Sequence, residues 1–308
     1  MERSLLFPKS TARIRSVRRT IRLEGLRTAT GIYAKAIARK LLRGRLGNRL
    51  TRVIPTQAKK EVLAAVEQRI VKLESHVRDE LQAAAQGDFI IICNAFPGTD
   101  QKYGGEFIRP RYKGYLRKGL KGRVVHLSNR IDAGSLETFE STENAIIRIS
   151  DGHVNTLASI LASGDAKILS HSPPPNIQKA LQKKIAPERL IYWFHGFEVR
   201  DYRRLYFNYT TSELATLKPR LNEITQWRTE ANKISFAEPA LKKVFVSNYL
   251  KDIAERDNNT QIENGQIIPN FIDGDVFGYR EKSADQMKRF LLIRAFERRN
   301  YGNDIAIE

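Results

Sequence analysis

Cysteine is almost absent from this sequence. Cys93 is the one cysteine among 308 residues, which excludes an intramolecular disulfide framework and an all-cysteine metal site. No apolar run approaches the roughly 18 residues that are needed to cross a bilayer. A secretory signal is also missing, because residues 5–7 are followed by Pro8 and arginines instead of an apolar core. These absences predict a protein of a reducing compartment, the cytoplasm.

Several motifs that would indicate an enzyme class are missing as well. The sequence has no G-x-G-x-x-G fingerprint of a dinucleotide fold, no G-x-S-x-G nucleophile elbow and no P-loop. Its five histidines include no pair with metal-ligand spacing, so neither a metal nor a cofactor is expected. The chain does have 41% hydrophobic residues, enough for a sizeable core, and a length that suggests about two domains.

Positive charge is concentrated at the amino-terminal end. Residues 1–60 hold 17 Lys and Arg against two acids, a net charge of 17 − 2 = +15 out of +19 for the chain. Tyr33, Ile37 and Leu41 recur at helical spacing among basic residues, which predicts a helix suited to an anionic membrane surface. A disordered tail, a wrongly assigned start and an organelle transit peptide are the alternatives. No nucleic-acid partner is expected, because no nucleic-acid-binding motif accompanies this charge.

The pattern changes after this leader. Residues 61–86 are predicted to form an amphipathic helix, because apolar side chains recur there at alternating spacings of three and four, at Leu63, Val66, Ile70, Leu73 and Val77. Two heptads are too few for a coiled coil. The helix is therefore expected to pack on the following domain or on the leader, with dimerisation as the alternative.

Short apolar runs rich in β-branched residues recur from residue 87 onward. They predict buried strands at 89–93, 122–128, 144–150, 166–172, 189–196, 242–248 and 289–295. Segments typical of helices lie between them at 106–120, 153–164 and 176–185. This alternation predicts an α/β fold with a doubly wound, mainly parallel sheet. Ligands bind to such sheets beyond the carboxyl ends of the strands, so the loops there are the candidate sites.

The loop after the first predicted strand carries adjacent glycines. Gly104 and Gly105 open the next helix, and Glu106 follows them. Glycine lets the backbone approach a ligand closely, and the first amides of a helix favour phosphate or a sugar hydroxyl. A plain turn is the alternative.

Two histidines stand at predicted strand ends. His195, followed by Gly196 and Glu198, is placed to bind a sugar hydroxyl or to carry a proton, and this interpretation is favoured over a buried structural histidine. For His171, which precedes three prolines, both interpretations stay open. Structural roles are predicted for the remaining histidines, His76, His126 and His153.

The order of segments resembles a known enzyme family. The chain has YGGEF (103–107), HG (195–196), KKVFVSNYLKD (242–252), IIPNFIDGDVFGY (267–279) and RFLLIRAFERRNYGND (289–304). This succession is similar to that of the retaining, nucleotide-sugar-dependent glycosyltransferases of the GT-B fold (group 1, family 4 type). The resemblance covers about residues 88–308 and implies transfer of a sugar to a glycan or lipid-linked acceptor in cell-surface polysaccharide synthesis.

The resemblance also implies roles for individual residues. His195 matches the histidine near the transferred sugar, and Gly104 and Gly105 match the loop that faces the donor diphosphate and the acceptor. Asn270 and Asp273 match a "PN-x-x-D" stretch at the domain junction. Two arginines, Arg294 and Arg299, would contact the diphosphate, Arg299 in place of the usual lysine; the expected substrate-binding set comprises Gly104, Gly105, Glu106, His171, Gly196, Glu198, Asn270 and Asp273.

Family members continue for roughly another domain, of about 100–150 residues on the usual domain scale. The resemblance therefore implies a chain truncated after the amino-terminal domain, with little transferase activity of its own. The expected divisions are a leader (1–60), a helix (61–86), the acceptor-side domain (87–288) and the start of a donor-side domain (289–308). The alternatives are a catalytically dead glycan-binding module and, through the leader, a nucleic-acid-binding protein. An expected location is the cytoplasm, peripherally on the inner face of the membrane.

Overall fold

A computed structural model describes residues 73–97, 104–128, 134–270, 272–274 and 277–288. The chain divides into two compact units, Met1–Leu73 and Glu74–Glu308. The predicted basic leader, the strand at 289–295 and the start of a donor-side domain lie outside the described residues.

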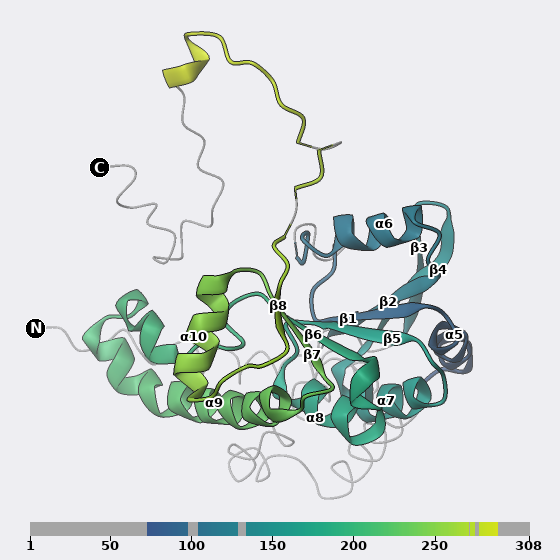
Figure 1. The fold of residues 1–308 in the computed structure, drawn as a ribbon, viewed down its shortest axis with the longest axis horizontal. Helices are drawn as coiled ribbons and strands as arrows, with labels where there is room; N and C mark the ends of the chain where they lie inside the picture. The colour runs from purple at the N-terminus through teal and green to yellow at the C-terminus, as the bar shows by residue number, and fades with distance from the viewer. Residues whose placement is uncertain (1–72, 98–103, 129–133, 271, 275–276, 289–308) are drawn as a thin grey trace, which may run out of the picture. The chain divides into compact units, whose positions relative to one another are not determined.

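The second unit is built on a sheet of eight strands in the order β3-β4-β2-β1-β5-β6-β7-β8 (Figure 1). Every neighbouring pair is parallel except β3 and β4, which are antiparallel. The strands are β1 (Phe89–Cys93), β2 (Gly122–Ser128), β3 (Ser135–Phe139), β4 (Thr142–Ser150), β5 (Lys167–His171), β6 (Leu190–Phe194), β7 (Lys242–Phe245) and β8 (Gly265–Ile267). The predicted doubly wound, mainly parallel α/β sheet is thus confirmed, and it is Rossmann-like.

The helices of the described part lie mostly between consecutive strands. They are α5 (Ser75–Ala85), α6 (Arg109–Arg117), α7 (Val154–Ala162), α8 (Pro175–Lys184), α9 (Thr211–Ala237) and α10 (Asn248–Asn258), with short 3₁₀ turns η1 (Asp151–His153), η2 (Pro187–Arg189), η3 (Tyr202–Asn208) and η4 (Gln286–Lys288). The three helices predicted at 106–120, 153–164 and 176–185 are confirmed as α6, α7 and α8. No helix in the described residues is long and apolar enough to span a membrane.

The predicted single helix over 61–86 is wrong in its extent. The described helix α5 begins at Ser75, and Glu74 before it has an extended backbone with ψ 143°. Leu73 is buried outside the helix, so its burial does not require the helical spacing that the sequence suggested. At the other end, the carbonyl of Ala85 accepts the N–H of Ala166, and a Cβ added to Gly164 would lie 2.0 Å from that same oxygen. The helix is therefore part of the α/β unit.

No strand was predicted from the sequence between those at 122–128 and 144–150, but the structure has strand β3 there. A tight turn joins β3 to β4, and Glu140 in this turn has a left-handed backbone with φ 53°. Non-glycine residues rarely adopt this conformation, and the sequence has no Asn-Gly or Asp-Gly pair there to signal a hairpin.

The core has one layer on each face of the sheet. Figure 1 shows α5, α7, α8 and α9 along one face and α6 along the other. Side chains alternate between faces along a strand, so Ile91 of β1 packs with Tyr112 of α6, while Ile90 and Ile92 are buried on the opposite face.

The order of the strands indicates where a ligand is expected to bind on this sheet. The chain builds outward from β1 through β2 to β4, then returns to lay β5 on the other side of β1. Ligands of open α/β sheets bind beyond the carboxyl ends of the strands at such a reversal. The residues that follow β1, β5 and β6 therefore lie where a ligand is expected to bind.

Candidate functional site

A pair of histidines lies at the carboxyl ends of β5 and β6. His171 ends β5 and pairs in register with Trp193 of β6, so the two side chains share the α6 face of the sheet. His195 follows β6 by one residue. The ring centroids of the two histidines are 5.2 Å apart, and Nδ1 of His171 lies 2.9 Å from Nε2 of His195, within hydrogen-bond distance.

Aromatic rings enclose this pair. Trp193 stacks on His171, with centroids 5.1 Å apart and planes within 9° of each other. Phe107, from the turn before α6, lies 4.1 Å from the ring of His195. The histidine pair is thus packed between a tryptophan on the sheet and a phenylalanine on the turn above it.

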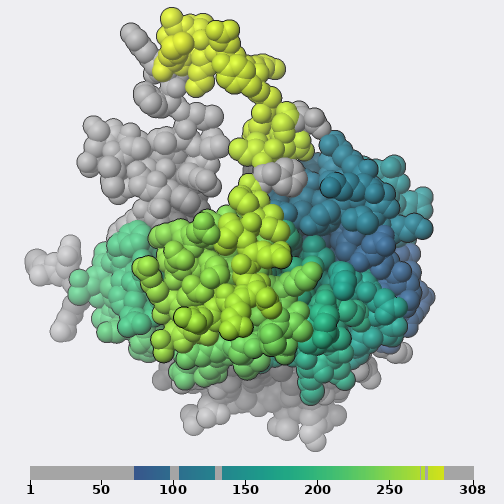
Figure 2. Space-filling view, in the orientation of Figure 1, coloured from purple at the N-terminus to yellow at the C-terminus, as the bar shows by residue number. Residues whose placement is uncertain are grey.

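A buried arginine supplies the charge of the site. The guanidinium of Arg111, on α6, lies 3.8 Å from the ring centroid of Trp193 and donates to the carbonyl of Pro269 at 3.4 Å. Arg111 is 7% exposed, and burial lowers its pKa, although an arginine remains charged in proteins. The contact also fixes the segment after β8, which lies against the start of α6 in the space-filling view (Figure 2).

Both histidines are neutral near pH 7. Burial, followed by the charge of Arg111, lowers the pKa of His195 to about 3. Burial also lowers the pKa of His171 well below its usual value, with His195 and Arg111 adding to the effect. A neutral imidazole has one N–H donor and one unprotonated nitrogen. The pair is therefore suited to accept a hydrogen bond from a hydroxyl and poorly suited to take up a proton.

Asn270 reaches the site from the segment after β8. Its Nδ2 lies 3.5 Å from Nδ1 of His195. Asp273 is half-buried three residues further on, and its backbone carbonyl accepts the N–H of Phe277 at 2.8 Å. The stretch that the sequence assigned to a domain junction thus begins beside the histidine pair.

The glycine turn lies at the same end of the sheet as the histidines. Gly105 has a left-handed φ of 71°, and a Cβ added there would lie 2.1 Å from the carbonyl oxygen of Ala95. The turn can therefore form only with glycine at this position, and it delivers Phe107 to His195. Gly104 is half-buried in the same turn, and Glu106 forms an ion pair with Arg109 at 3.8 Å.

Glu198 holds the backbone of the site. It was predicted among the substrate-binding residues, but it is 3% exposed and its carboxylate accepts the backbone N–H groups of His195 and Gly196, the latter at 3.1 Å. Burial raises the pKa of this carboxyl, and the two amides oppose the shift. The carboxylate faces the chain and fixes the turn after β6. A Cβ added to Gly196 would meet nothing within 4 Å, so this turn opens onto free space.

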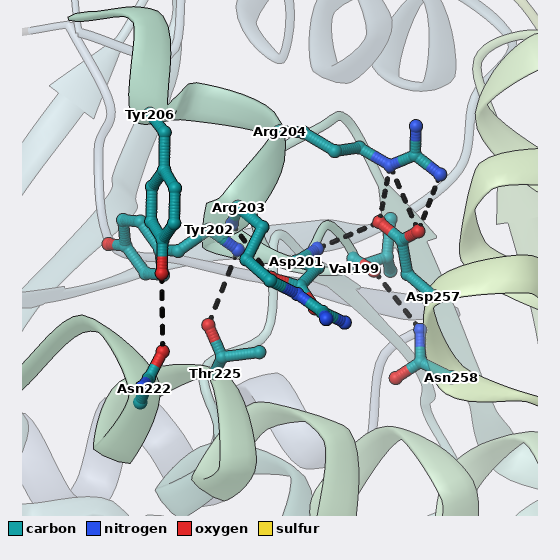
Figure 3. A network of polar contacts seen from close by, with 10 residues as sticks. All are labelled: Val199, Asp201, Tyr202, Arg203, Arg204, Tyr206, Asn222, Thr225, Asp257 and Asn258. Atoms are coloured by element: carbon teal, nitrogen blue, oxygen red, sulfur yellow. Dashed lines mark hydrogen bonds and ion pairs between the residues drawn. The ribbon is translucent and has the colours of Figure 1, made fainter. Parts of the chain in front are cut away.

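The segment that follows this turn is anchored to two helices. The carboxylate of Asp257, on α10, accepts the backbone N–H of Asp201 at 2.8 Å and makes three contacts with Nε and Nη2 of Arg204 (Figure 3). On the other side, the N–H of Tyr202 donates to the hydroxyl of Thr225, on α9, at 3.3 Å. These contacts hold the chain between β6 and α9 in place.

Some parts of this site were missed by the sequence analysis. Arg111 and Phe107 were not singled out, although both lie in the segment 106–120 that was predicted as a helix, in which residues four apart share a face. The alternation Ile191, Trp193, His195 was a signal that the tryptophan shares a face with the histidine. The predicted diphosphate contacts Arg294 and Arg299 lie outside the described residues.

No cluster of three or more histidine, cysteine or carboxylate side chains that could hold a metal occurs among the described residues. Comparison with known proteins identifies nothing similar: no family model matches the chain, and no curated protein or solved structure matches it either. A function can therefore be inferred only from the site itself and from the pattern of the sequence.

Proposed function

We propose that the described unit is the acceptor-binding domain of a nucleotide-sugar-dependent glycosyltransferase of the GT-B type. In this proposal a glycan or lipid-linked sugar of cell-surface polysaccharide synthesis binds at the carboxyl ends of β5 and β6. The observation that carries the proposal is the neutral pair of His171 and His195, which is enclosed by aromatic rings at the crevice of a doubly wound sheet.

The composition of the site suits a sugar. Binding sites for small molecules combine aromatic surfaces with a few polar groups that fix orientation. Phe107, which is half-buried, offers an aromatic surface, and His195 offers a nitrogen that can accept a hydrogen bond from a hydroxyl. Trp193 is buried between His171 and Arg111 and supports the pair from within the protein. A Cβ added to Gly196, the residue after His195, would meet nothing within 4 Å, which leaves room for a ligand at this turn.

The transfer itself would break the bond between the anomeric carbon and a phosphate oxygen, whose electron pair leaves with the diphosphate. The acceptor oxygen forms the new bond, and its proton passes to the departing diphosphate. Because burial lowers the pKa of His195 to about 3, the imidazole orients the sugar and does not take this proton. Arginine side chains and helix-end amides would stabilise the growing charge, a role predicted for Arg294 and Arg299.

A second candidate is a glycan-binding module without transferase activity. The low pKa of His195 agrees with it equally well, because hydrogen bonding to a hydroxyl needs no proton transfer. In both cases the basic leader would bring the chain to the anionic inner face of the membrane, since residues 1–60 carry most of the net charge.

The test combines a binding assay and a turnover assay on the purified chain. A panel of soluble glycans is titrated into the wild type, into His195→Ala and into His76→Ala, whose side chain is 58% exposed. The proposal expects at least one glycan to bind, and about tenfold weaker binding in His195→Ala alone, equivalent to one lost hydrogen bond. The absence of binding to any glycan would overturn it.

Nucleotide sugars are then added to the complex with the glycan that binds. Formation of the elongated product supports a transferase, whereas binding without product supports the glycan-binding module. A product that forms equally well in His195→Ala would show that this histidine has no part in the reaction.

A further inference from the structure

The proposed function uses His195 and leaves its neighbour without a role. His171 is 1% exposed, and its Nδ1 faces Nε2 of His195 at 2.9 Å. Its other nitrogen, Nε2, is buried and has no hydrogen-bond partner among the described residues. An unpartnered buried polar atom lowers the free energy of unfolding, so packing alone does not explain a histidine at this position.

The contacts of the pair determine where its protons lie. An amide nitrogen can only donate, so Nδ2 of Asn270 makes Nδ1 of His195 an acceptor. The proton of His195 is then on Nε2, and it is donated to Nδ1 of His171. His171 in turn carries its own proton on Nε2. Each ring is fixed in one tautomer by the contact it makes with the next.

We infer that His171 is a positioning residue that keeps the proton of His195 on Nε2, so that Nδ1 of His195 can accept a hydrogen bond from a neutral hydroxyl that takes the place of the exposed Asn270 amide. The inference rests on the proposed function and narrows it. A lone pair attracts an O–H and repels the oxygen atoms of a carboxylate or a phosphate. The group bound at this position is therefore an uncharged sugar hydroxyl, and an acidic sugar that places its carboxylate there is rejected.

The surroundings of the pair support this assignment. Trp193 stacks on the ring of His171 within 9° of parallel and prevents it from turning out of line. The guanidinium of Arg111 lies over the other end of that stack, on the ring of Trp193 at 3.8 Å, and disfavours an imidazolium on either histidine. Because the His171 ring can neither turn nor become charged, its remaining effect on His195 is on which ring nitrogen of His195 carries the proton.

The experiment reads the tautomer directly. The full chain is labelled with ¹⁵N at histidine, and the ring nitrogens of His195 are observed by multiple-bond ¹H–¹⁵N spectroscopy without ligand. Two substitutions separate packing from hydrogen bonding. His171→Phe keeps a ring for the stack on Trp193 and removes the acceptor, whereas the side-chain oxygen of His171→Asn takes the approximate place of Nδ1. The control is His153→Phe, since His153 is also buried.

In the wild type we expect a proton on Nε2 of His195 and none on Nδ1. In His171→Phe the long contact of 3.5 Å with Asn270 would be the remaining restraint on the tautomer, so the two tautomers should mix and the affinity for a neutral glycan should fall about tenfold. His171→Asn should restore the tautomer and most of the affinity, and His153→Phe should change neither. A wild-type His195 protonated on Nδ1, or an unchanged His195 spectrum in His171→Phe, would overturn the inference.

The wild-type spectrum decides the tautomer even if a variant does not fold. The spectra without ligand also separate this inference from the proposed function. If the tautomers behave as expected and no glycan binds, the pairing stands and the proposed function fails. If a glycan binds and His195→Ala weakens it while the tautomer does not depend on His171, the proposed function stands and the inference fails.

Discussion

Gly105 is the residue of the site whose backbone leaves the least choice of side chain. Its φ of 71° disfavours any other residue, and a Cβ would overlap the carbonyl oxygen of Ala95. We expect Gly105→Ala to lower the free energy of unfolding by about 1–3 kcal/mol. Urea denaturation followed by circular dichroism measures this loss.

Gly114 provides the matched control on the neighbouring helix α6. A Cβ added there meets nothing within 4 Å, and alanine is favoured over glycine in a helix by about 1 kcal/mol. Gly114→Ala should therefore raise the free energy of unfolding slightly. Equal effects of the two substitutions would contradict the account of the turn before α6.

The neutral histidines make stability depend on pH. Their folded pKa values lie below the usual 6.5, that of His195 at about 3, so the unfolded chain binds more protons as the pH falls from about 6.5. Stability is therefore full above this range and is lost on acidification, at up to about 1.4 kcal/mol per pH unit for each histidine. Urea denaturation at a series of pH values between 7.5 and 5 measures the slope.

A comparison of variants isolates the contribution of the pair. His171→Phe should reduce the slope by up to about 1.4 kcal/mol per pH unit, because one histidine no longer has to be kept neutral. A slope that is the same in wild type and His171→Phe would show that His171 is protonated in the folded chain.

Residue patterns in the sequence located the strand-end residues and missed how they combine. His171, His195 and Gly105 were found because each stands where a predicted strand ends or a helix begins. The pairing of the two histidines depends on the register of β5 against β6, which no local pattern encodes. Arg111 resembles any other basic residue of a helix until Trp193 is known to lie beneath it.

At the scale of elements, the buried parallel strands were predictable, and the longest helix of the described residues was not singled out. Strands covered on both faces are continuous apolar runs, which identified β1, β2, β5 and β6. Helix α9 has 27 residues, contains Pro219 and has few buried positions in its first half. It therefore lacks the apolar periodicity that marks a helix packed on a core along its whole length.

The contacts shown in Figure 3 hold the segment after the histidine turn. Asp257→Asn removes the charge that binds Arg204 and should lower the free energy of unfolding by about 1–3 kcal/mol, since the aspartate side chain is 8% exposed. Trypsin should then cut more readily after Arg203 and Arg204. Urea denaturation and limited proteolysis measure the two effects.

Arg203→Gln is the control for this substitution. The side chain of Arg203 is 75% exposed, and pairs of this kind contribute at most about 1 kcal/mol. The variant should unfold almost as the wild type does. If it is destabilised as much as Asp257→Asn, the buried carboxylate has no special part in anchoring the segment.

At the scale of the whole molecule, charge is divided unequally along the chain. Residues 1–60 have a net charge of +15, against +4 for the remaining residues. We expect the full chain to float with vesicles that contain anionic lipid at low salt, and a chain without residues 1–60 to stay in solution. Flotation at low and high salt measures this, and binding should weaken as salt screens the charges.

Neutral vesicles provide the control for this experiment, because electrostatic attraction requires anionic lipid. A full chain that remains in solution with anionic vesicles at low salt would contradict the predicted membrane role of the leader. Equal flotation with and without residues 1–60 would place the lipid contact elsewhere.

The close fit between Ala85 and Gly164 indicates that a chain shortened at its amino-terminal end must keep helix α5. Val77 and Leu81 of α5 are fully buried, and the carbonyl of Ala85 occupies the space above Gly164. A recombinant chain that begins before Leu73 keeps α5 and the apolar surface that it covers. A chain that begins at Gly87 lacks α5 and would expose this apolar surface to solvent, so we expect it in the insoluble fraction of the expression host.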